Sequence, residues 1–347
     1  MVSKRSDQSD DAVCTREITE MNVSIGIDVS KEKLDLGWLR DPATNKKKSK
    51  VFKNDPKHFE ALVLWITKNT KVEPQEILIT LEPTGIYHEP LIYFLHDRGF
   101  NIYLANPAQA NNYAKSQGQV HKTDKLDAIL LARFGLQQEN RTLWQPEASE
   151  IRGLKAMIRR LEALEKDRQR ECNRLEASEF SDVSPRVQQS VKDMIVVLEE
   201  EIKRLQQDID DHIDRYPPLK KNRELLETIK GVGPVISREM VCLLASKCFK
   251  TAKQLACYLG LIPQIKESGK YKGHSSLSKQ GPSRLRAKLY MAAVVSAQHN
   301  PLIKGQYERL LSAGKKKMQA LGAAMRKLAQ ICFGVVKNQQ EFQPQMP

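Results

Sequence analysis

Short apolar segments alternate with amphipathic ones across residues 22–135. The segments VSIGIDVS, EILITLEPTG and NIYLANP are rich in Val, Ile and Leu and are typical of strands, and KLDLGWL and KKSKVFKN add two more. The segments PKHFEALVLWITKN and YHEPLIYFLHDRG carry apolar residues at helical spacing. Strands that alternate with helices predict an α/β domain with a central mixed sheet, to which we assign residues 22–145. Residues 1–21 have no apolar run and are predicted to be a flexible N-terminal extension.

Residues 146–216 are polar, with the pattern of long helices. Apolar residues in the second half follow a 4-3-4-3-4 spacing, which is typical of a coiled-coil seam. The sequence SDVSP at 181–185 predicts a break between two helices. We expect a helical coiled-coil hairpin that joins two domains and supports a homo-oligomer; an intramolecular spacer without a partner is the alternative. The seam residues are Val191, Ile195, Leu198, Ile202, Leu205 and Ile209.

A mainly helical C-terminal domain is predicted over residues 217–335, followed by a tail at 336–347. Gly231, Val232 and Gly233 separate two helical patterns in LLETIKGVGPVISREMVCLL, which predicts a helix-hairpin-helix. Glycines allow a tight turn and bring backbone N–H groups to a phosphate at the positive end of the next helix. Gly231 and Gly233 are therefore candidate nucleic-acid contacts, and an ordinary tight turn between helices is the alternative.

Charge is distributed unevenly along the chain. Residues 221–347 contain 22 Lys and Arg, six Glu and no Asp, which gives +16, whereas the whole chain carries +14. A C-terminal half of this kind is expected to bind a polyanion; a basic surface that only keeps the protein in solution is the alternative. No apolar run is long enough to cross a membrane, and six cysteines without a CxxC pair indicate thiols in a reducing cytoplasm.

Four acidic residues stand at the ends of predicted elements. Asp28 ends the strand VSIGID, and Glu82 ends the strand EILITLE. Asp124 and Asp127 lie three apart in the helical segment HKTDKLDAILLARF, on one face of the helix. Carboxyl ends of strands line the crevice of an α/β sheet, and four carboxylates in one pocket call for divalent cations, Mg²⁺ or Mn²⁺. Taken singly, Asp28 as a turn cap, Glu82 as a surface residue and Asp124 as a helix N-cap are the alternatives.

A second candidate site is the Gly-, Ser- and Lys-rich segment at 258–293. Its polar loop is suited to wrapping a phosphate backbone. Basic residues at the start of the following helix are unfavourable for the helix dipole, so we expect them to face a bound anion. The candidate nucleic-acid contacts are Lys270, Lys272, Lys279, Arg284 and Arg286. From the residues alone, the nucleophile is open among Ser268, Ser275, Ser276, Ser278 and Ser283.

The segments GIDVSKEKLD, EPTGIYHEPL and HKTDKLDAILLARF resemble the RuvC-like, ribonuclease-H-fold domain of the DEDD insertion-sequence transposases. This group includes Piv-type DNA invertases and bridge-RNA-guided recombinases, and the resemblance covers about residues 22–335. It implies that the catalytic, metal-binding D-E-D-D residues are Asp28, Glu82, Asp124 and Asp127. The C-terminal segment resembles the family's transposase domain as G-L-x-P, S-G, G, S-K-x-G and L-R, which implies that Ser268 is the nucleophile.

The same resemblance implies a DNA transposase or recombinase. Ser268 would attack a DNA phosphodiester, assisted by Mg²⁺ at the four acids, through a covalent 5′-phosphoserine intermediate. The implied partners are donor and target DNA, a guiding bridge RNA and further copies of the chain in a dimer or tetramer, in the bacterial cytoplasm at the nucleoid. A metal-dependent RuvC-like nuclease or junction resolvase without a covalent intermediate is the alternative enzyme. An architectural nucleic-acid-binding protein is the alternative without catalysis.

Overall fold

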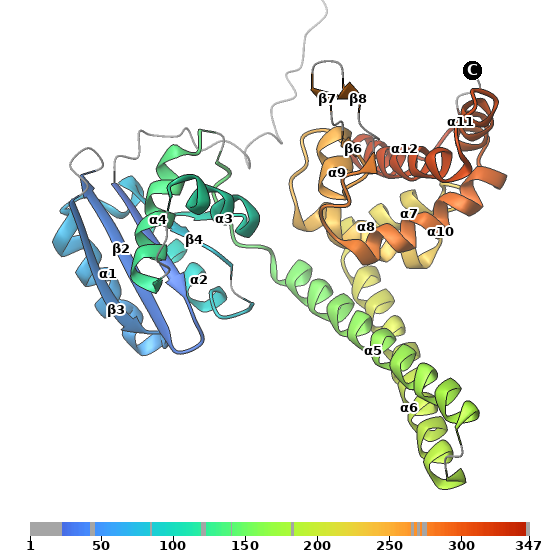
Figure 1. The fold of residues 1–347 in the computed structure, drawn as a ribbon, viewed down its shortest axis with the longest axis horizontal. Helices are drawn as coiled ribbons and strands as arrows, with labels where there is room; N and C mark the ends of the chain where they lie inside the picture. The colour runs from blue at the N-terminus through green and yellow to red at the C-terminus, as the bar shows by residue number, and fades with distance from the viewer. Residues whose placement is uncertain are drawn as a thin grey trace, which may run out of the picture. The chain divides into compact units, whose positions relative to one another are not determined.

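The structure is a computed structural model of the 347-residue chain, shown in Figure 1. It describes residues 23–344 except 42–45, 84, 119–122, 140, 182–183, 265–266, 269–270 and 273–275, and only the backbone of 267, 271 and 272. The predicted extension at 1–21 and the end of the predicted tail, 345–347, lie outside the described residues. The chain divides into two compact units, Met1–Pro146 and Glu147–Pro347, and each is described by itself. Among the described residues, no helix has the length and apolarity needed to cross a membrane.

Unit 1, Met1–Pro146, contains a mixed sheet with helices on both faces. Its elements are β1 (Val23–Val29), β2 (Lys33–Asp41), β3 (Lys46–Lys53), α1 (Pro56–Thr70), the 3-10 helix η1 (Pro74–Glu76), β4 (Ile77–Leu81), α2 (Glu89–Asp97), β5 (Asn101–Leu104), α3 (Pro107–Ser116) and α4 (Asp124–Gln137). The strand order is β3-β2-β1-β4-β5; β2 runs antiparallel to β1 and β3, and β4 runs parallel to β1 and β5. The α/β class with a mixed sheet is thus confirmed, and the RuvC-like fold stays a prediction.

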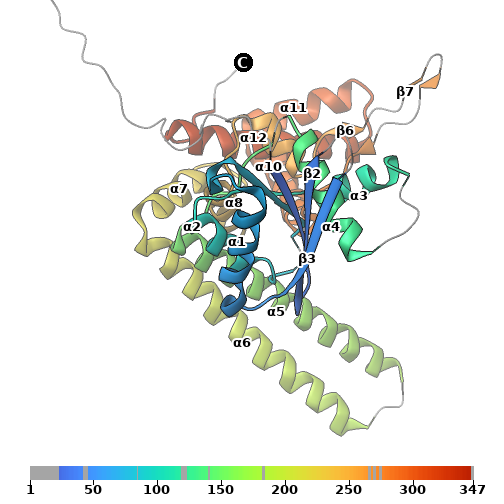
Figure 2. The same cartoon turned by 90° about the vertical axis from the view of Figure 1, so that its left-hand side faces the viewer.

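The two faces of the sheet have different roles. Figure 2 shows α1 and α2 on one side of the strands and α4 on the other. Along β1, Ile25 and Ile27 point into the apolar core under α1 and α2, where they join Phe59. The alternate residues, Ser24 and Asp28, therefore face α4.

Helix α4 packs on β1 through direct backbone contact. A Cβ built at Gly26 would lie 1.8 Å from the carbonyl oxygen of Ala128, so only glycine allows this approach. The Oγ of Ser24 donates a hydrogen bond of 2.8 Å to the carbonyl oxygen of Ala132. These contacts hold α4 across the strand that carries Asp28, with the first turn of the helix toward the end of β1.

Helix α3 has no counterpart in the sequence prediction. Its sequence, PAQANNYAKS, buries only Ala110, so it has almost no apolar periodicity to detect. The helix begins at the cap Asn106, whose side chain accepts hydrogen bonds from the backbone N–H groups of Ala108 and Gln109. Capping, which a periodicity pattern does not reveal, therefore defines this helix.

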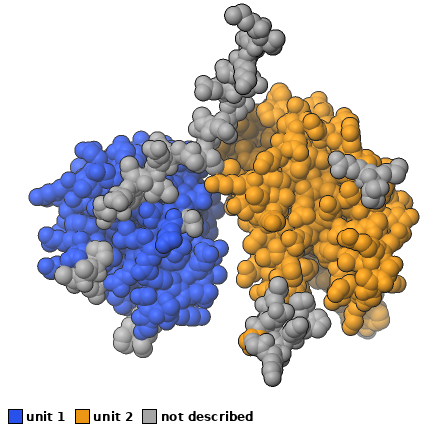
Figure 3. Space-filling model, turned by 90° about the horizontal axis from the view of Figure 1, so that it is seen from above, with its two compact units in different colours: residues 1–146 blue, residues 147–347 orange. Residues whose placement is uncertain are grey.

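Unit 2, Glu147–Pro347, is mainly helical (orange in Figure 3). It begins with two long helices packed on each other, α5 (Ser149–Phe180) and α6 (Pro185–Arg215), on either side of the predicted break. Five predicted seam residues of α6 are half-buried and Ile209 is fully buried, while the coiled-coil geometry itself stays a prediction. The remaining elements are α7 (Pro217–Glu227), α8 (Pro234–Ser246), α9 (Ala252–Tyr258), β6 (Pro263–Gln264), β7 (Glu267–Ser268), β8 (Tyr271–Lys272), β9 (Ser276–Leu277), α10 (Ser283–His299), α11 (Pro301–Ser312) and α12 (Lys317–Asn338).

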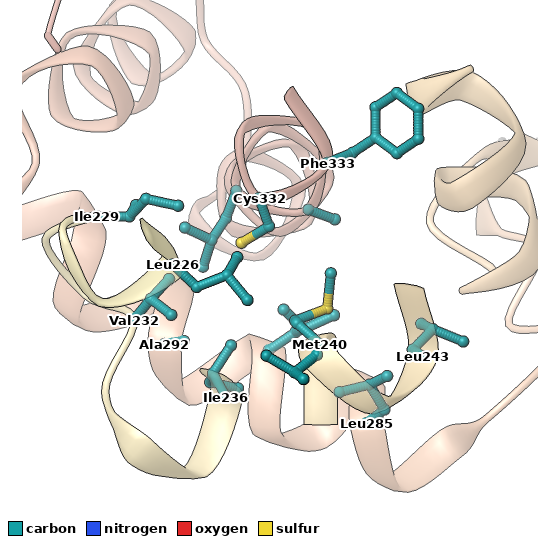
Figure 4. Packing of buried hydrophobic residues seen from close by; sticks show 14 of the residues in the cluster. Leu226, Ile229, Val232, Ile236, Met240, Leu243, Leu285, Ala292, Cys332 and Phe333 are labelled. Carbon is teal, nitrogen blue, oxygen red and sulfur yellow. The ribbon is translucent and has the colours of Figure 1, made fainter. Parts of the chain in front are cut away.

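One apolar core joins the helices of unit 2. Figure 4 shows Leu226 of α7, Met240 of α8, Leu285 of α10 and Cys332 of α12 packed together. The same core includes Leu154 of α5, so the base of the long hairpin is held by the helices that follow it. The predicted domain boundary at residues 216 and 217 stays a prediction.

Candidate active site

Three carboxylates lie side by side on the α4 face of the sheet. Asp28 of β1 is paired directly with Asp35 of the antiparallel strand β2. In the parallel pair β1 and β4, Ile27 lies opposite Leu81, so the next residue, Glu82, follows in register with Asp28. The sheet therefore brings together two predicted acids and adds Asp35, which is absent from the predicted set.

The other two predicted acids lie in the first turn of α4. The N-cap of this helix is Thr123, whose hydroxyl accepts a hydrogen bond of 3.3 Å from the backbone N–H of Leu126. The alternative that Asp124 caps the helix is therefore wrong. Asp124 and Asp127 instead add negative charge at the positive end of the helix dipole, which stabilises both carboxylates.

The pKa of Asp28 shows that these groups converge. Burial raises the pKa of Asp28 from 3.8 to about 6, and four neighbouring carboxylates add to the increase. In decreasing order of effect, these neighbours are Asp124, Asp127, Asp35 and Glu82. The other three predicted acids thus lie close enough to Asp28 to raise its pKa, as does Asp35, which the sequence did not reveal.

One ammonium group lies among the carboxylates. The Nζ of Lys33 is 2.5 Å from Oδ2 of Asp124 and 3.1 Å from Oδ2 of Asp35. Hydrogen bonds to Asp124 and Asp35 raise the pKa of Lys33. Since Asp35 is buried and belongs to β2, Lys33 connects the sheet to the first turn of α4 and offsets part of the negative charge.

Asn54 connects the loops that follow β1 and β4. Its Nδ2 donates hydrogen bonds to the carbonyl oxygens of Ser30, at 2.8 Å, and Tyr87, at 3.0 Å. The turn after β1 is closed by Ser30, whose hydroxyl donates to the carbonyl oxygen of Lys33, so Asp28 is not the turn cap. Asn54 is a supporting residue that the sequence prediction missed, because a lone Asn after a strand carries no recognisable signal.

The donor set fits a divalent cation that prefers oxygen ligands. Within the described part of the chain, no group of three His, Cys, Asp or Glu side chains is arranged to hold a metal ion, and the carboxylate of Asp124 binds Lys33. The residue types are nevertheless hard oxygen donors, and burial together with their mutual repulsion raises the pKa of Asp28. A bound cation would remove this repulsion. The side chains therefore fit a divalent cation by their chemistry, although their positions in the described part of this structure do not form a metal site.

Replacing Asp28 by Asn should stabilise the protein in the absence of divalent cations at about pH 8 and not at about pH 3.5. Because folding raises the pKa of Asp28 from 3.8 to about 6, ionised Asp28 destabilises the fold fully above about pH 6, and this cost falls as the pH drops from 6 and is lost below 3.8. The gain at high pH should be about 1 to 2 kcal/mol after allowance for solvent screening. Thermal unfolding of both proteins in EDTA across this pH range measures it, and equal unfolding temperatures at high pH would contradict the clustering.

Ser268 lies in unit 2, in the short strand β7, and is exposed. Its backbone pairs with Tyr271 of β8. Among the other candidate nucleophiles, Ser276 and Ser283 are exposed, and the Oγ of Ser278 is buried, which excludes it from reaching a large substrate. Ser275 lies outside the described residues.

The glycine turn between α7 and α8 is held by α10. Gly231 has a φ of 100°, and a Cβ there would lie 1.9 Å from the Oγ of Ser296. Ser296 and Asn300 both donate hydrogen bonds to the carbonyl oxygen of Lys230, at 3.2 and 3.3 Å. Gly233, the N-cap of α8, is exposed with open space around it. Phosphate binding at Gly231 and Gly233, and the helix-hairpin-helix, stay predictions.

Arg284 and Arg286 bind protein groups in place of the expected anion. Arg284 donates to the carbonyl oxygen of Glu162 at 2.6 Å and pairs with the carboxylate of Glu165 at 2.8 Å. Carboxylates of α5 therefore supply the counter-charge at the start of α10. Arg286 donates to loop carbonyl oxygens, including that of Gly281 at 3.1 Å. Nucleic-acid binding by either residue stays a prediction.

The predicted lysines of the loop have different positions. Lys279 is exposed, with a φ of 54°, and its backbone N–H donates to the carbonyl oxygen of Gly260 at 3.2 Å. Lys270 lies outside the described residues, and only the backbone of Lys272, in β8, is described. Their contact with nucleic acid stays a prediction.

Comparison with known proteins gives matches over both units. A family model described as "Transposase" matches residues 25–178, and one described as "Transposase IS116/IS110/IS902 family" matches residues 223–308. Two pilin gene-inverting proteins, from Moraxella bovis and Moraxella lacunata, are each 33% identical over 321 residues, which is 92% of this chain and 97% of theirs. The structure of T. thermophilus RuvC in complex with a Holliday junction substrate is 14% identical and covers 35% of this chain and 99% of its own. Its TM-score is 0.28.

Proposed function

This chain belongs to the transposase family of the IS116, IS110 and IS902 insertion elements, and we propose that it cleaves and rejoins DNA through a serine nucleophile and bound Mg²⁺. The family and the gene-inverting relatives make it a DNA recombinase. In the proposal the nucleophile is Ser268, and the metal ligands are Asp28, Glu82, Asp124 and Asp127. The observation that carries the proposal is geometric: the sheet places Asp28 beside Asp35 and Glu82, and Asp124 and Asp127 lie in the first turn of the helix packed on β1.

The four predicted acids are the proposed ligands, with Mn²⁺ as a possible substitute for Mg²⁺. When bound, the ion would activate a hydroxyl and stabilise the charge that develops on the phosphate oxygens. Asp124 would then hold the ion in place of Lys33, while the buried Asp35 would keep Lys33 close. Lys33 thereby holds the first turn of α4 in place before the metal binds.

The covalent step is assigned to Ser268. Its Oγ forms a bond to phosphorus, the bond from phosphorus to the 3′ oxygen breaks, and the serine proton ends on the leaving 3′ hydroxyl. The 3′ hydroxyl of another strand then attacks the phosphorus of the 5′-phosphoserine. The bond from phosphorus to Oγ breaks, the proton returns to Ser268, and the two DNA strands are joined. The exposed position of Ser268 in β7 supports this role, because a duplex can approach it.

Guidance by a bridge RNA and assembly into a dimer or tetramer complete the proposal, with the nucleoid as the place of action. The charge of +16 over residues 221–347 supports binding of a second nucleic acid beside DNA. Assembly through the long hairpin is supported by exposed apolar side chains at its far end. These are Phe180, Val187, Met194 and Val197. Sequencing of the RNA that copurifies with the protein from its host tests guidance, which predicts one discrete RNA encoded beside the gene.

The chemistry is tested with the purified protein and a supercoiled plasmid that carries the gene and its native flanks. We expect strand cleavage and a protein–DNA adduct stable to detergent in Mg²⁺, and neither product in EDTA. Cleavage without an adduct would favour the metal-dependent nuclease, which uses water. DNA binding without any cleavage would favour an architectural protein.

A further inference from the structure

Helices α11 and α12 of unit 2 carry an unbalanced positive charge (Figure 1). Residues 301–338 contain eight Lys and Arg and a single Glu, in a chain whose net charge is +14. Half of the net charge of the protein therefore lies on about a ninth of its length. This concentration calls for a partner of opposite charge.

Several other cations of unit 2 are neutralised inside the unit. The ion pairs include Arg238 with Asp210 at 2.5 Å, Arg284 with Glu165 at 2.8 Å and Lys288 with Glu239 at 2.6 Å. By contrast, Arg309, Arg326 and Lys327 have no side-chain hydrogen bond or ion pair to any described residue. Their charges are available to a ligand, whereas those of Arg284 and Lys288 are not.

These three cations line one groove between α11 and α12, with a volume of about 740 Å³. Leu302 contributes apolar surface to the same groove, and Gly305 leaves open space where a side chain would stand. The groove thus combines positive charge, an apolar wall and a stretch of accessible helix backbone. A sugar-phosphate chain has the complementary properties, because its phosphates are negatively charged and regularly spaced and its deoxyribose presents C–H groups.

We propose that this α11–α12 groove, defined by Arg309, Arg326 and Lys327, binds the phosphate backbone of duplex DNA. The inference rests on the proposed function, which supplies DNA as the substrate, and it adds a surface that none of the predicted nucleic-acid contacts includes. Guanidinium groups bind phosphate oxygens bidentately, so Arg309 and Arg326 suit a phosphate backbone. The described lining contains no aromatic residue, which leaves an acidic protein partner without an anchor. Contacts of this kind position DNA without reading its sequence.

The test is the salt dependence of DNA binding by a triple variant, Arg309→Gln, Arg326→Gln and Lys327→Gln. Affinity for a fluorescent duplex of unrelated sequence is measured in EDTA over a range of KCl concentrations, so that neither the metal nor Ser268 takes part. Loss of three phosphate contacts should reduce the slope of log K against log salt by about 2.7. The matched control is Arg186→Gln, Lys192→Gln and Lys203→Gln, which removes the same charge from exposed positions of α6.

A reduced slope in the α11–α12 variant but not in the α6 variant would support the groove. Equal slopes for the α11–α12 variant and the wild type would overturn it, as would equal losses in both variants, because the effect would then be general charge. A loss confined to a single-stranded RNA probe would also overturn the assignment to DNA. DNA is not cleaved in this assay, because EDTA removes the metal. If the proposed serine or metal chemistry were wrong, the slopes would be unaffected, and the cleavage assay would show that error independently. Thermal unfolding of all three proteins checks that each is folded.

Discussion

Changing Asp124 and Asp127 together to asparagine should abolish Mg²⁺-dependent DNA cleavage, with a loss in rate of at least about 10³-fold. Both carboxylates lie in the first turn of α4 and act on the pKa of Asp28, so both belong to the proposed ligand set. A metal site that stabilises the transition state by several kcal/mol loses about that much when two anionic ligands become neutral amides. The plasmid assay measures the rate, and Mn²⁺ binding followed by electron paramagnetic resonance measures loss of the ion.

The control for this variant removes two carboxylates from the same unit outside the cluster. Glu89 and Asp97 are exposed residues at the two ends of α2, and Glu89→Gln with Asp97→Asn changes the charge by the same amount. This control should cleave DNA and bind Mn²⁺ as the wild type does. The Asp124 and Asp127 variant should remain folded, because asparagine has nearly the size of aspartate, the N-cap Thr123 is unchanged and repulsion around Asp28 is relieved. Cleavage at the wild-type rate in that variant would contradict the metal role.

Those members of the acidic cluster that stand at the end of a predicted strand or share a helix face could be predicted from the sequence. Asp28 and Glu82 follow apolar segments that stop abruptly, and the structure has β1 and β4 ending beside them. Asp124 and Asp127 share a helix face because of their spacing, whatever else the helix contacts. The mixed sheet followed from the same local patterns, since strands and helices are recognised from residues close in sequence.

Residues that depend on pairing between elements were not predictable in this way. Asp35 reaches Asp28 only because β1 and β2 form a hairpin in the register that places them opposite each other. Lys33 then lies two residues before Asp35 on the same face of β2, which brings its Nζ to Asp124. A single-residue shift of that register would have moved both side chains to the opposite face.

Long-range partners also explain how the structure accommodates the basic residues at the start of α10. The unfavourable placement of Arg284 at a helix start is real, but its counter-charges come from Glu162 and Glu165 of α5, more than a hundred residues earlier. The sequence around Arg284 reveals the unfavourable position of its charge, but not the distant carboxylates that neutralise it. Three cations of the α11–α12 groove are likewise not recognisable from local sequence. Among the described residues, the side chains of Arg309, Arg326 and Lys327 have no ion-pair partner, and only the structure shows that they line one groove.

Replacing Ser268 by alanine should eliminate the covalent protein–DNA adduct and strand rejoining, with a loss of at least about 10⁴-fold, while Mn²⁺ binding remains at the wild-type level. In the proposed reaction the hydroxyl of Ser268 replaces the 3′ oxygen on phosphorus, so no adduct can form without it. Metal binding should persist, because the carboxylate cluster lies in the other unit. Detergent gels of labelled plasmid fragments measure the adduct, and the same resonance measurement reports the metal.

The matched control is Ser276→Ala, an exposed serine of the neighbouring strand β9 that was also open as a nucleophile from the sequence alone. It should form the adduct normally. If Ser268→Ala still formed the adduct and Ser276→Ala did not, the nucleophile would be Ser276 and the assignment by resemblance would be wrong. If Ser268→Ala cut DNA at full rate with no adduct in either protein, water would be the attacking group. The carboxylates around Asp28 would then suffice for catalysis, and the basic unit would serve only to bind the substrate.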